Sequence, residues 1–509
     1  MRSKNVSLSL VTSLIYQVVL TISNFILIGL IIKYYGSAYN GLNSSVQNVI
    51  NYLTIVEAGI ALSAIYALYK PLASLDWDEI NRILHSANDM YKKSGIVFAF
   101  LLVLVAFVYP LTLTSEIYYY EVFFFILILG SSSLVEFFLN GKYRVLLMGD
   151  QKSYIVNTFQ TLVLFISALV KIYLIINGYS FLIVVLMGSM FISARYILSK
   201  IYIKIKYKNL NLSQKFVNKY VFENKNSVIL HQISGLVIFN SPLVLVSIFL
   251  GLELASIYAI YNLIFNGIFM LITLLTKSSV SSFGNLLVKE SSDRIRRVFY
   301  SFQSIFFIIG FLLFTVTFIM FEPFIHLYLD GDALGYFDSK LITLFTIVGL
   351  LNMIRMPHNI FIEAAGHYQQ TKYRALFEAI INIVFSIIFI NIFGIYGALM
   401  GSIASFIYRS FDIILYSSKN ILNISPIKSL YRISINTILF MAILYTYVVL
   451  LRSPVKTEFW GKWVLSGIVT TVILSVVYLT INVLINPDLY NDLRSRLNVV
   501  TKPFKRSKK

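Results

Sequence analysis

The chain is dominated by long apolar segments, each close to the roughly 20 residues that a helix needs to cross a bilayer. Of its 509 residues, 58% are hydrophobic and only 13% are charged, whereas a soluble domain carries about 25% charge. An apolar fraction this large cannot be buried in a soluble core, so lipid is the expected solvent. Backbone groups in lipid must be paired within the segment, and barrel strands are much shorter, so helices are predicted.

About fourteen such segments are predicted, which makes the fold class an all-α polytopic membrane protein with about 14 transmembrane helices. Their approximate limits are 6–34, 40–68, 94–114, 119–147, 153–177, 181–201, 226–250, 254–286, 297–322, 338–366, 373–393, 395–417, 431–451 and 461–485. An even number of spans places both termini on the same side of the membrane.

Positive charge gathers in the loops on one side of the predicted membrane. One of these loops holds Lys200, Lys204, Lys206, Lys208, Lys215, Lys219 and Lys225. The opposite loops hold few basic residues, namely Arg452, Lys456 and Lys462. Because basic loops stay in the cytoplasm, both termini are expected to be cytoplasmic, in a bacterial inner membrane.

The net charge of +19 is explained by this orientation and by contact with anionic membrane lipids. Docking of a partner enzyme on the basic loops is the alternative. Nucleic acid is not expected as a partner. The longest predicted outer loop, 323–337, is also too short for a polysaccharide polymerase, which would be expected to carry a long one.

The sequence contains traces of an internal repeat. The matched pairs are 78–84 with 293–299, 149–154 with 366–373, 186–189 with 399–402, and Arg195 with Arg409. Matches in one order at an offset of 213 to 219 residues indicate a duplicated unit. Each copy contains six predicted helices, and because six is even, the two copies have the same orientation in the membrane.

Four regions follow from this repeat. They are an N-terminal lobe of helices 1–6 (1–205), a cytoplasmic linker (206–225), a C-terminal lobe of helices 7–12 (226–420), and helices 13–14 with a basic tail (421–509). Two parallel repeats of this kind suit alternating access, in which two lobes rock around a site at their interface.

Polar side chains inside the predicted helices mark a cavity or an internal pair, because a charge at bilayer depth costs about 2.5–3.5 kcal/mol. The clearest array is Glu136, Asn140 and Arg144, whose i, i+4, i+8 spacing puts them on one helix face. The candidate substrate-binding residues are Lys277, Arg355, His358, Glu136, Asn140, Arg144, Gln17 and Asn24, and the candidates for ion coupling are Glu57, His231 and Glu363.

Several arginines have a structural alternative to a place in a cavity. Arg144, Arg195 and Arg409 lie toward predicted inner helix ends, so they are expected to extend to the lipid headgroups. Arg409 and Asp412 are three residues apart, and an internal salt bridge is expected between them.

The deeper ionisable groups leave two interpretations open. Glu57, Lys277 and Arg355 could line a cavity or form structural pairs. A single histidine such as His231 is more often a hydrogen-bonded helix contact than a proton relay.

No catalytic arrangement is apparent in the sequence. It contains no Gly-rich phosphate loop, no metal-ligand cluster and no nucleophile–base pair of recognisable spacing, and it has no cysteine. The chain is therefore not expected to be an enzyme. No cofactor is expected either, beyond H⁺ or Na⁺ as a coupling ion.

A series of short motifs follows one another along residues 1–420. They are YGSAYNGL at 35–42, EAG at 57–59, LYKPL at 68–72, RVLL at 144–147, DQKSY at 150–154, IYAIY at 257–261, PFI at 323–325, Gly366, and GIYGALMG at 394–401. Together with the fourteen-helix layout, they resemble the bacterial polysaccharide flippases, the Wzx-like branch of the multidrug/oligosaccharidyl-lipid/polysaccharide exporter superfamily.

The resemblance implies a lipid-linked oligosaccharide that is turned from the inner to the outer leaflet for capsule, exopolysaccharide or teichoic-acid assembly. Related lipid II flippases hold the pyrophosphate with cationic residues, and Lys277 and Arg355 are the matching candidates by chemistry. The partners implied are the substrate, membrane lipids, a polysaccharide polymerase and glycosyltransferases, with the chain acting as a monomer. Many relatives have an acidic residue near the middle of helix 7, where this chain reads Asn240-Ser-Pro242.

Three other functions stay open. A multidrug/cation antiporter of the same superfamily would need a carboxylate-lined, net-negative cavity. A membrane glycosyltransferase or acyltransferase would need catalytic carboxylates or a histidine at the membrane interface. A scaffold for polysaccharide enzymes would need no charge inside the membrane.

Overall fold

The computed structural model of the chain describes residues 2–57, 59–114, 116–211, 226–329, 335–451 and 459–485. Regular structure in these ranges is helical, without a strand. Thirteen of the described helices are long and apolar enough to cross a membrane, and a fourteenth span is a pair of helices with a break between them. The predicted fold class, an all-α polytopic membrane protein, is confirmed.

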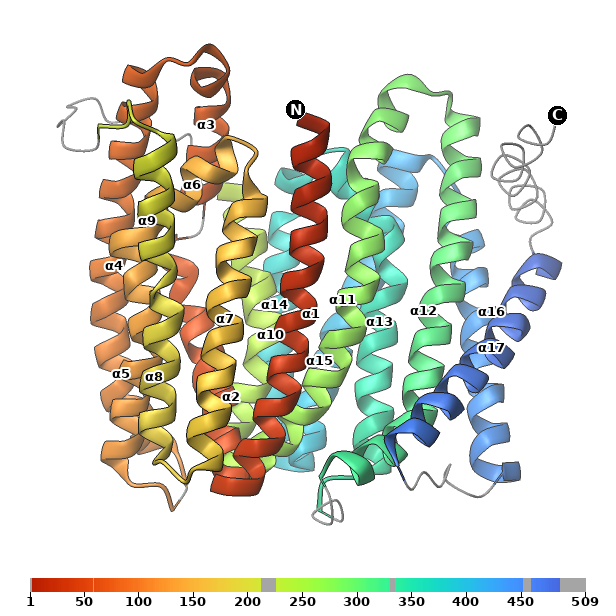
Figure 1. The fold of residues 1–509 in the computed structure, drawn as a ribbon. Helices are drawn as coiled ribbons and strands as arrows, with labels where there is room; N and C mark the ends of the chain where they lie inside the picture. The colour runs from red at the N-terminus through yellow and green to blue at the C-terminus, as the bar shows by residue number, and fades with distance from the viewer. Residues whose placement is uncertain are drawn as a thin grey trace, which may run out of the picture. The chain divides into compact units, whose positions relative to one another are not determined.

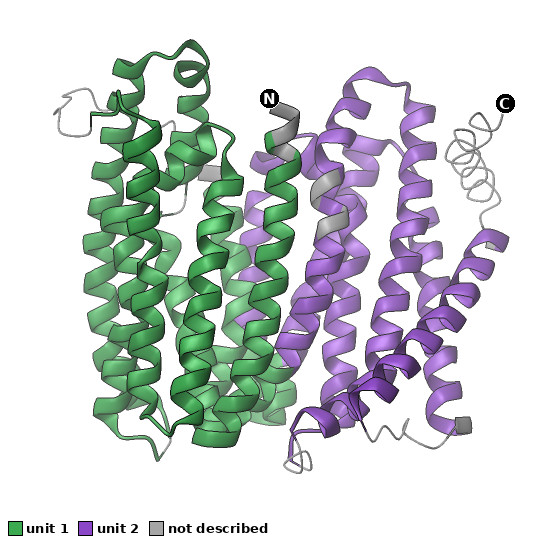
Figure 2. Cartoon of the chain, in the orientation of Figure 1, with its two compact units in different colours: residues 1–260, 386–398 green, residues 261–385, 399–509 purple. Residues whose placement is uncertain are grey.

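The chain packs into two compact units (Figure 2). Unit 1 contains residues 1–260 and 386–398, and unit 2 contains residues 261–385 and 399–509. These units are defined by how the helices pack. The domain limits expected near residues 205, 225 and 420 were defined by the sequence repeat instead, and they stay a prediction. Most of the predicted linker and the whole basic tail lie outside the described residues.

The helices of unit 1 run in chain order through the N-terminal half (Figure 1). They are α1 (Arg2–Tyr35), α2 (Ser37–Leu53), α3 (Ile60–Ser74), α4 (Trp77–Thr112), α5 (Tyr119–Val135), α6 (Gly141–Gly149), α7 (Ser153–Ile176), α8 (Phe181–Ser193), α9 (Arg195–Lys206) and α10 (Asn226–Leu250). Helix α1 lies along α7, α7 along α8, α4 along α5, and α10 along α2.

The second predicted span is interrupted near its middle. Helix α2 continues into one 3₁₀ turn, η1 (Thr54–Glu57), and α3 begins after Gly59. Gly59 has a φ of +83°, a left-handed conformation that glycine adopts without strain. The axes of the two helices differ by 44°. The Val56 carbonyl accepts a hydrogen bond from Ser94 Oγ at 2.7 Å, and the interruption leaves Glu57 at the end of a short turn.

The fourth span contains a second irregularity. A π turn, η2 (Glu136–Asn140), joins α5 to α6 within one continuous span from Tyr119 to Gly149. A π turn of this kind rotates the side chains that follow it relative to a regular helix, and such turns are frequent at functional sites.

Helix α4 begins at Trp77, whereas the sequence placed the start of the third span near residue 94. The Asp76 side chain caps the helix by accepting a hydrogen bond from the Glu79 amide at 3.0 Å. Hydropathy detects only the apolar part of a helix, so it misses the polar turns that extend the same helix beyond the lipid.

Polar side chains and a close backbone approach join α2 to the start of α11 (Leu252–Lys289) inside unit 1. Asn40 Nδ2 donates to Ser256 Oγ at 2.7 Å. A Cβ atom on Gly41 would lie 1.8 Å from the Leu252 carbonyl oxygen. The absence of a side chain at residue 41 therefore allows the two backbones to touch.

Unit 2 is arranged around α12, which packs against α13, α16 and α17 (Figure 1). Its helices are the rest of α11, α12 (Ser292–Tyr328), α13 (Ser339–Ala364), most of α14 (Tyr368–Phe393) and of α15 (Ile395–Ser417), α16 (Pro426–Tyr445) and α17 (Trp460–Ile485), with π turns η4 (Ser418–Leu422) and η5 (Thr446–Leu451). Residues 386–398, at the end of α14 and the start of α15, belong to unit 1. The hydroxyls of Thr315 and Tyr478 lie 2.8 Å apart and tie α17 to α12.

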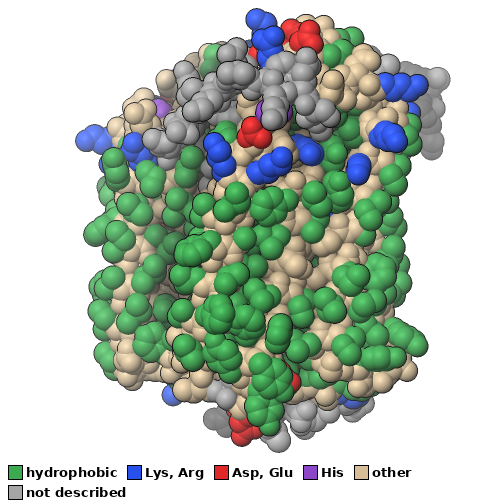
Figure 3. Space-filling model, turned by 90° about the vertical axis from the view of Figure 1, so that its left-hand side faces the viewer, with side chains coloured by type: hydrophobic (Ala, Val, Ile, Leu, Met, Phe, Trp, Pro, Cys, Tyr) green, Lys and Arg blue, Asp and Glu red, His purple; other side chains and the backbone are tan. Residues whose placement is uncertain are grey.

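The lipid-facing character of the surface is visible in Figure 3. On the face drawn there, hydrophobic side chains cover a broad middle band, and lysines and arginines gather beyond one edge of the band. Exposed apolar side chains such as Phe100 on α4 and Phe165 on α7 belong to helices that have the length and composition of membrane spans. The protein is therefore a multi-pass membrane protein.

Candidate functional site

Unit 1 contains an ion network centred on Glu136. One carboxylate oxygen lies 3.1 Å from Arg144 Nε, and the other lies 3.2 Å from Arg195 Nη2. Asn140 Nδ2 donates to the second oxygen at 2.7 Å. Within the array predicted from the i, i+4, i+8 spacing, Glu136 thus contacts both Asn140 and Arg144, and α9 adds Arg195.

Glu57 joins this network through Arg144. Arg144 Nη2 lies 3.3 Å from both oxygens of Glu57 and also 3.3 Å from the hydroxyl of Tyr91. About a quarter of the Glu57 side chain and a fifth of the Arg144 side chain are exposed (26% and 22%). The network therefore has an accessible end at the interruption between α2 and α3.

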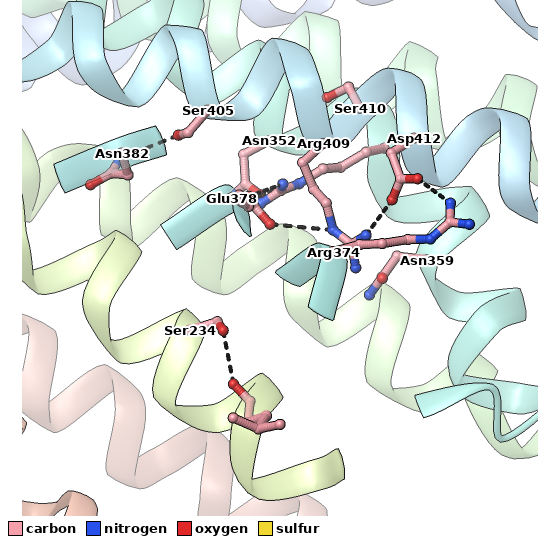
Figure 4. Close-up of polar contacts among 12 residues, drawn as sticks. Ser234, Asn352, Asn359, Arg374, Glu378, Asn382, Ser405, Arg409, Ser410 and Asp412 are labelled. Carbon is pink, nitrogen blue, oxygen red and sulfur yellow. Dashed lines mark hydrogen bonds and ion pairs between the residues drawn. The ribbon is translucent and has the colours of Figure 1, made fainter. Parts of the chain in front are cut away.

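Unit 2 contains a second network, centred on Glu378 of α14 (Figure 4). Arg355 of α13 and Arg409 of α15 both contact this carboxylate, Arg409 Nε at 3.3 Å. Arg355 also donates from Nε and Nη2 to Asn352 Oδ1 at 3.1 and 2.8 Å. Because three helices contribute to it and Glu378 is almost fully buried, this network fixes α13, α14 and α15 against one another.

The second network continues to Asp412. Arg409 and Arg374 approach this carboxylate from opposite sides (Figure 4). The predicted internal salt bridge between Arg409 and Asp412 is confirmed. The guanidinium of Arg374 also lies over the ring of Tyr416, 4.9 Å from its centroid, and with 43% of its side chain exposed it is the accessible end of this network.

The expectation that the three arginines extend to lipid headgroups is wrong for Arg409, of which 4% of the side chain is exposed. Arg144 and Arg195 are also mostly buried, and both contact Glu136. The physical reason is that each arginine has an internal carboxylate within reach, and in lipid an ion pair replaces hydration.

The remaining candidates lie elsewhere or are already engaged. His358 is fully buried on α13, with Nε2 3.3 Å from Gln303 Nε2 and Nδ1 2.6 Å from Ser417 Oγ. Glu363 accepts a hydrogen bond from Asn359 at 2.7 Å. Binding roles for Arg355 and His358 and a coupling role for Glu363 stay predictions.

Other candidates are partly exposed or lie outside the described part of the chain. His231 is half-buried on α10, and Gln17 and Asn24 are half-buried on α1. Lys277 belongs to α11, and its side chain lies outside the described residues. Among the described residues, no group of three or more His, Asp or Glu side chains could hold a metal ion.

Three polar residues near Glu378 were not predicted from the sequence. Asn352 and Arg374 belong to the second network, and Asn382 lies one turn beyond Glu378 on α14. Asn382 Nδ2 donates to the hydroxyls of Ser402 and Ser405 at 3.2 and 3.3 Å. A signal was available, because Arg374, Glu378 and Asn382 have the same i, i+4, i+8 spacing that identified the array in the fourth span.

A cavity of about 530 Å³ opens in unit 1. It is lined by Asn5, Tyr69, Leu72, Ala73, Gly149, Asp150, Gln151 and Lys152. Lys152 Nζ lies 2.7 Å from Asp150, and Tyr207 OH donates to the same carboxylate at 2.6 Å. Burial and this hydrogen bond raise the pKa of Tyr207. The two charged groups of the lining therefore neutralise each other.

No protein-family model and no curated protein sequence matches the chain, but solved structures do. A multidrug-resistance MATE transporter of the MOP superfamily, in an inward-facing conformation, is 13% identical with a TM-score of 0.63, over 79% of this chain and 94% of its own. The lipid II flippase MurJ, in an inward closed conformation, is 15% identical with a TM-score of 0.63, over 93% of this chain and 99% of its own.

A MOP-superfamily transporter from Pyrococcus furiosus is 16% identical with a TM-score of 0.51, over 83% of this chain and 97% of its own. At these identities the likeness establishes the fold alone. The chain has the fold of MATE transporters and of the MurJ flippase.

Proposed function

We propose that the protein is a transporter that moves a lipid-linked oligosaccharide with an anionic, phosphate-containing headgroup across the bacterial cytoplasmic membrane. The direction proposed is from the inner to the outer leaflet, by alternating access and with an ion gradient as the energy source. The transporter fold supports the general activity, and the charge of the membrane interior supports the class of substrate.

The observation that carries the proposal is the charge balance of the two networks. They contain five arginines (Arg144, Arg195, Arg355, Arg374 and Arg409) and four carboxylates (Glu57, Glu136, Glu378 and Asp412), and each of these carboxylates contacts at least one arginine. An exporter of cations would need a carboxylate free to bind its substrate or H⁺. A surplus of arginine instead suits a phosphate, which guanidinium groups bind with two parallel hydrogen bonds.

The extent of the structural likeness is a second support. The match to the MurJ lipid II flippase covers 93% of this chain, which is more than the two lobes predicted to end at residue 420 of 509. It must therefore include part of α16 or of α17. The match to the inward-facing MATE transporter covers 79% and does not require those helices.

The multidrug alternative has an observation of its own. Several of the similar structures are MATE transporters, one of which matches the fold with the same TM-score as MurJ. For the Pyrococcus furiosus transporter, however, a reversed polarity of the binding pocket was taken to suggest a different function. The same reasoning from polarity favours an anionic substrate here.

The proposal is tested in proteoliposomes that contain a pyrophosphate-linked isoprenoid oligosaccharide from the source cell, with a cationic dye in parallel vesicles. Movement of the lipid-linked sugar without dye efflux is expected. Lys277→Ala should reduce the movement, whereas Lys289→Ala, at the exposed end of the same helix, should not. Dye efflux without movement of the sugar would assign the chain to the multidrug class.

A further inference from the structure

The two networks differ in how tightly their arginines are held. In unit 2, Arg355 donates to Asn352 at 2.8 Å and is in direct contact with Glu378. In unit 1, a single nitrogen of Arg144 is shared among both Glu57 oxygens and Tyr91 OH, all at 3.3 Å. Strong guanidinium–carboxylate bonds are about 2.7–2.9 Å long and are often formed in parallel by two nitrogens, so Glu57 is a weakly held partner of Arg144.

Glu57 is also placed where it can move. It ends the single turn η1, which is followed by the left-handed Gly59. A residue at such an interruption can shift without disrupting a long helix. Arg144, by contrast, lies in the continuous fourth span, and its Nε also forms an ion pair with Glu136 at 3.1 Å, so Arg144 keeps a carboxylate neighbour when Glu57 moves.

The charges of the network show what would follow if Glu57 withdrew. Glu57 and Glu136 balance Arg144 and Arg195 in the present arrangement. Without Glu57, two guanidinium groups would face one carboxylate. The surplus positive charge would lie on Arg144 beside Tyr91 OH, at the end of the network that is accessible, and would attract an anion.

We propose that Arg144 is the phosphate ligand of unit 1, and that the Glu57 carboxylate occupies it until the phosphate of the substrate displaces Glu57. The identity of the lipid in this inference rests on the proposed function. The exchange of one anion for another on Arg144 does not. Displacement of Glu57 would act on the turn between α2 and α3, which links headgroup binding to the interruption of that span.

The test measures binding of farnesyl pyrophosphate and of inorganic pyrophosphate to the full-length protein in detergent micelles. Because Glu57 competes with the ligand, Glu57→Gln should bind farnesyl pyrophosphate about three- to tenfold more tightly. Arg144→Gln should bind it at least about tenfold more weakly. Arg144→Lys should bind with intermediate affinity, because lysine keeps the charge but not the two parallel bonds.

The matched controls are Glu79→Gln and Arg82→Gln, which alter a surface pair on α4 whose charged atoms are 4.0 Å apart. Both should leave binding within about twofold of the unaltered protein. Thermal unfolding of every variant checks that it is folded. If Arg144→Gln does not fold, the binding of farnesyl pyrophosphate by Glu57→Gln and Arg144→Lys tests the proposal. Weaker or unchanged binding by Glu57→Gln would overturn the proposal.

Comparing farnesyl pyrophosphate with inorganic pyrophosphate shows whether the protein recognises the phosphate itself or needs the lipid chain. If farnesyl and inorganic pyrophosphate respond alike to Glu57→Gln, the exchange takes place at the phosphate itself, as proposed. A response of neither ligand would overturn the exchange even if the protein moves lipid-linked oligosaccharide. A response of both in a protein that moves no such lipid would leave the exchange standing and remove the proposed function.

Discussion

Arg409 Nε lies 3.3 Å from a carboxylate oxygen of Glu378, and no more than 5% of either side chain is exposed. Arg409 is the predicted counterpart of Arg195 in the internal repeat, and Arg195 likewise contacts a buried carboxylate, Glu136, at 3.2 Å. The two arginines that the predicted repeat matches thus both pair with a buried carboxylate, Glu136 in one case and Glu378 in the other.

Replacing Arg409 with methionine should destabilise the protein strongly. The change leaves Glu378 and Asp412 with one arginine each in a buried site, and loss of one partner of a buried ion pair costs about 3–5 kcal/mol. Thermal unfolding in detergent measures the effect. Arg296→Met is the control, because its partner Asp293 is 86% exposed, and a shift there as large as that of Arg409→Met would contradict the structural role.

The number of spans could be predicted from the sequence, because twenty apolar residues have few alternatives to a membrane helix. The sequence could predict the pairing of buried charges only for Arg409 and Asp412, three residues apart on one helix. For Glu136 and Arg144 it predicted a shared helix face. Glu57 and Arg144 are 87 residues apart, and no local pattern joins them. The start of α4 and the break at Gly59 were missed because hydropathy does not report helix N-caps or backbone dihedral angles.

Gly41→Ala should be severely destabilising, whereas Gly235→Ala should be tolerated. A Cβ atom on residue 41 would lie 1.8 Å from the Leu252 carbonyl oxygen, so the backbone itself would have to shift. Gly235, inside α10, has nothing within 4 Å of its added Cβ, and alanine there should stabilise the helix by up to about 1 kcal/mol. Expression level and thermal unfolding of the two variants, compared side by side, test the close contact of α2 with α11.

The predicted orientation can be tested directly, because the chain has no cysteine. Ser180, between α7 and α8, and Lys208, after α9, are both exposed. If the basic loops are cytoplasmic, Ser180→Cys should react with a membrane-impermeant maleimide in intact cells, and Lys208→Cys should react only after the inner membrane is permeabilised. The opposite labelling pattern would invert the topology and remove the inner-to-outer direction proposed for transport.

Asn436 and Asn482 form a reciprocal pair that joins α16 to α17. Asn436 Nδ2 donates to Asn482 Oδ1 at 3.2 Å, and Asn482 Nδ2 donates to Asn436 Oδ1 at 2.9 Å, with both side chains buried. Asn482→Ala should cost about 1 kcal/mol. Hydrogen bonds between membrane helices contribute about 0.6 kcal/mol on average, and Asn436 Oδ1 loses its donor, although Asn436 Nδ2 keeps its bond to the Arg432 carbonyl.

The double replacement of Asn436 and Asn482 by leucine should cost less than the sum of the two single leucine replacements, because no buried amide oxygen is then left without its donor from the other helix. Thermal unfolding of the singles and the double in one detergent gives the coupling. Asn420→Ala is the control, since Asn420 is exposed and donates to the Tyr416 carbonyl one turn earlier on its own helix. Strictly additive costs would mean that the two amides do not hold α16 and α17 together.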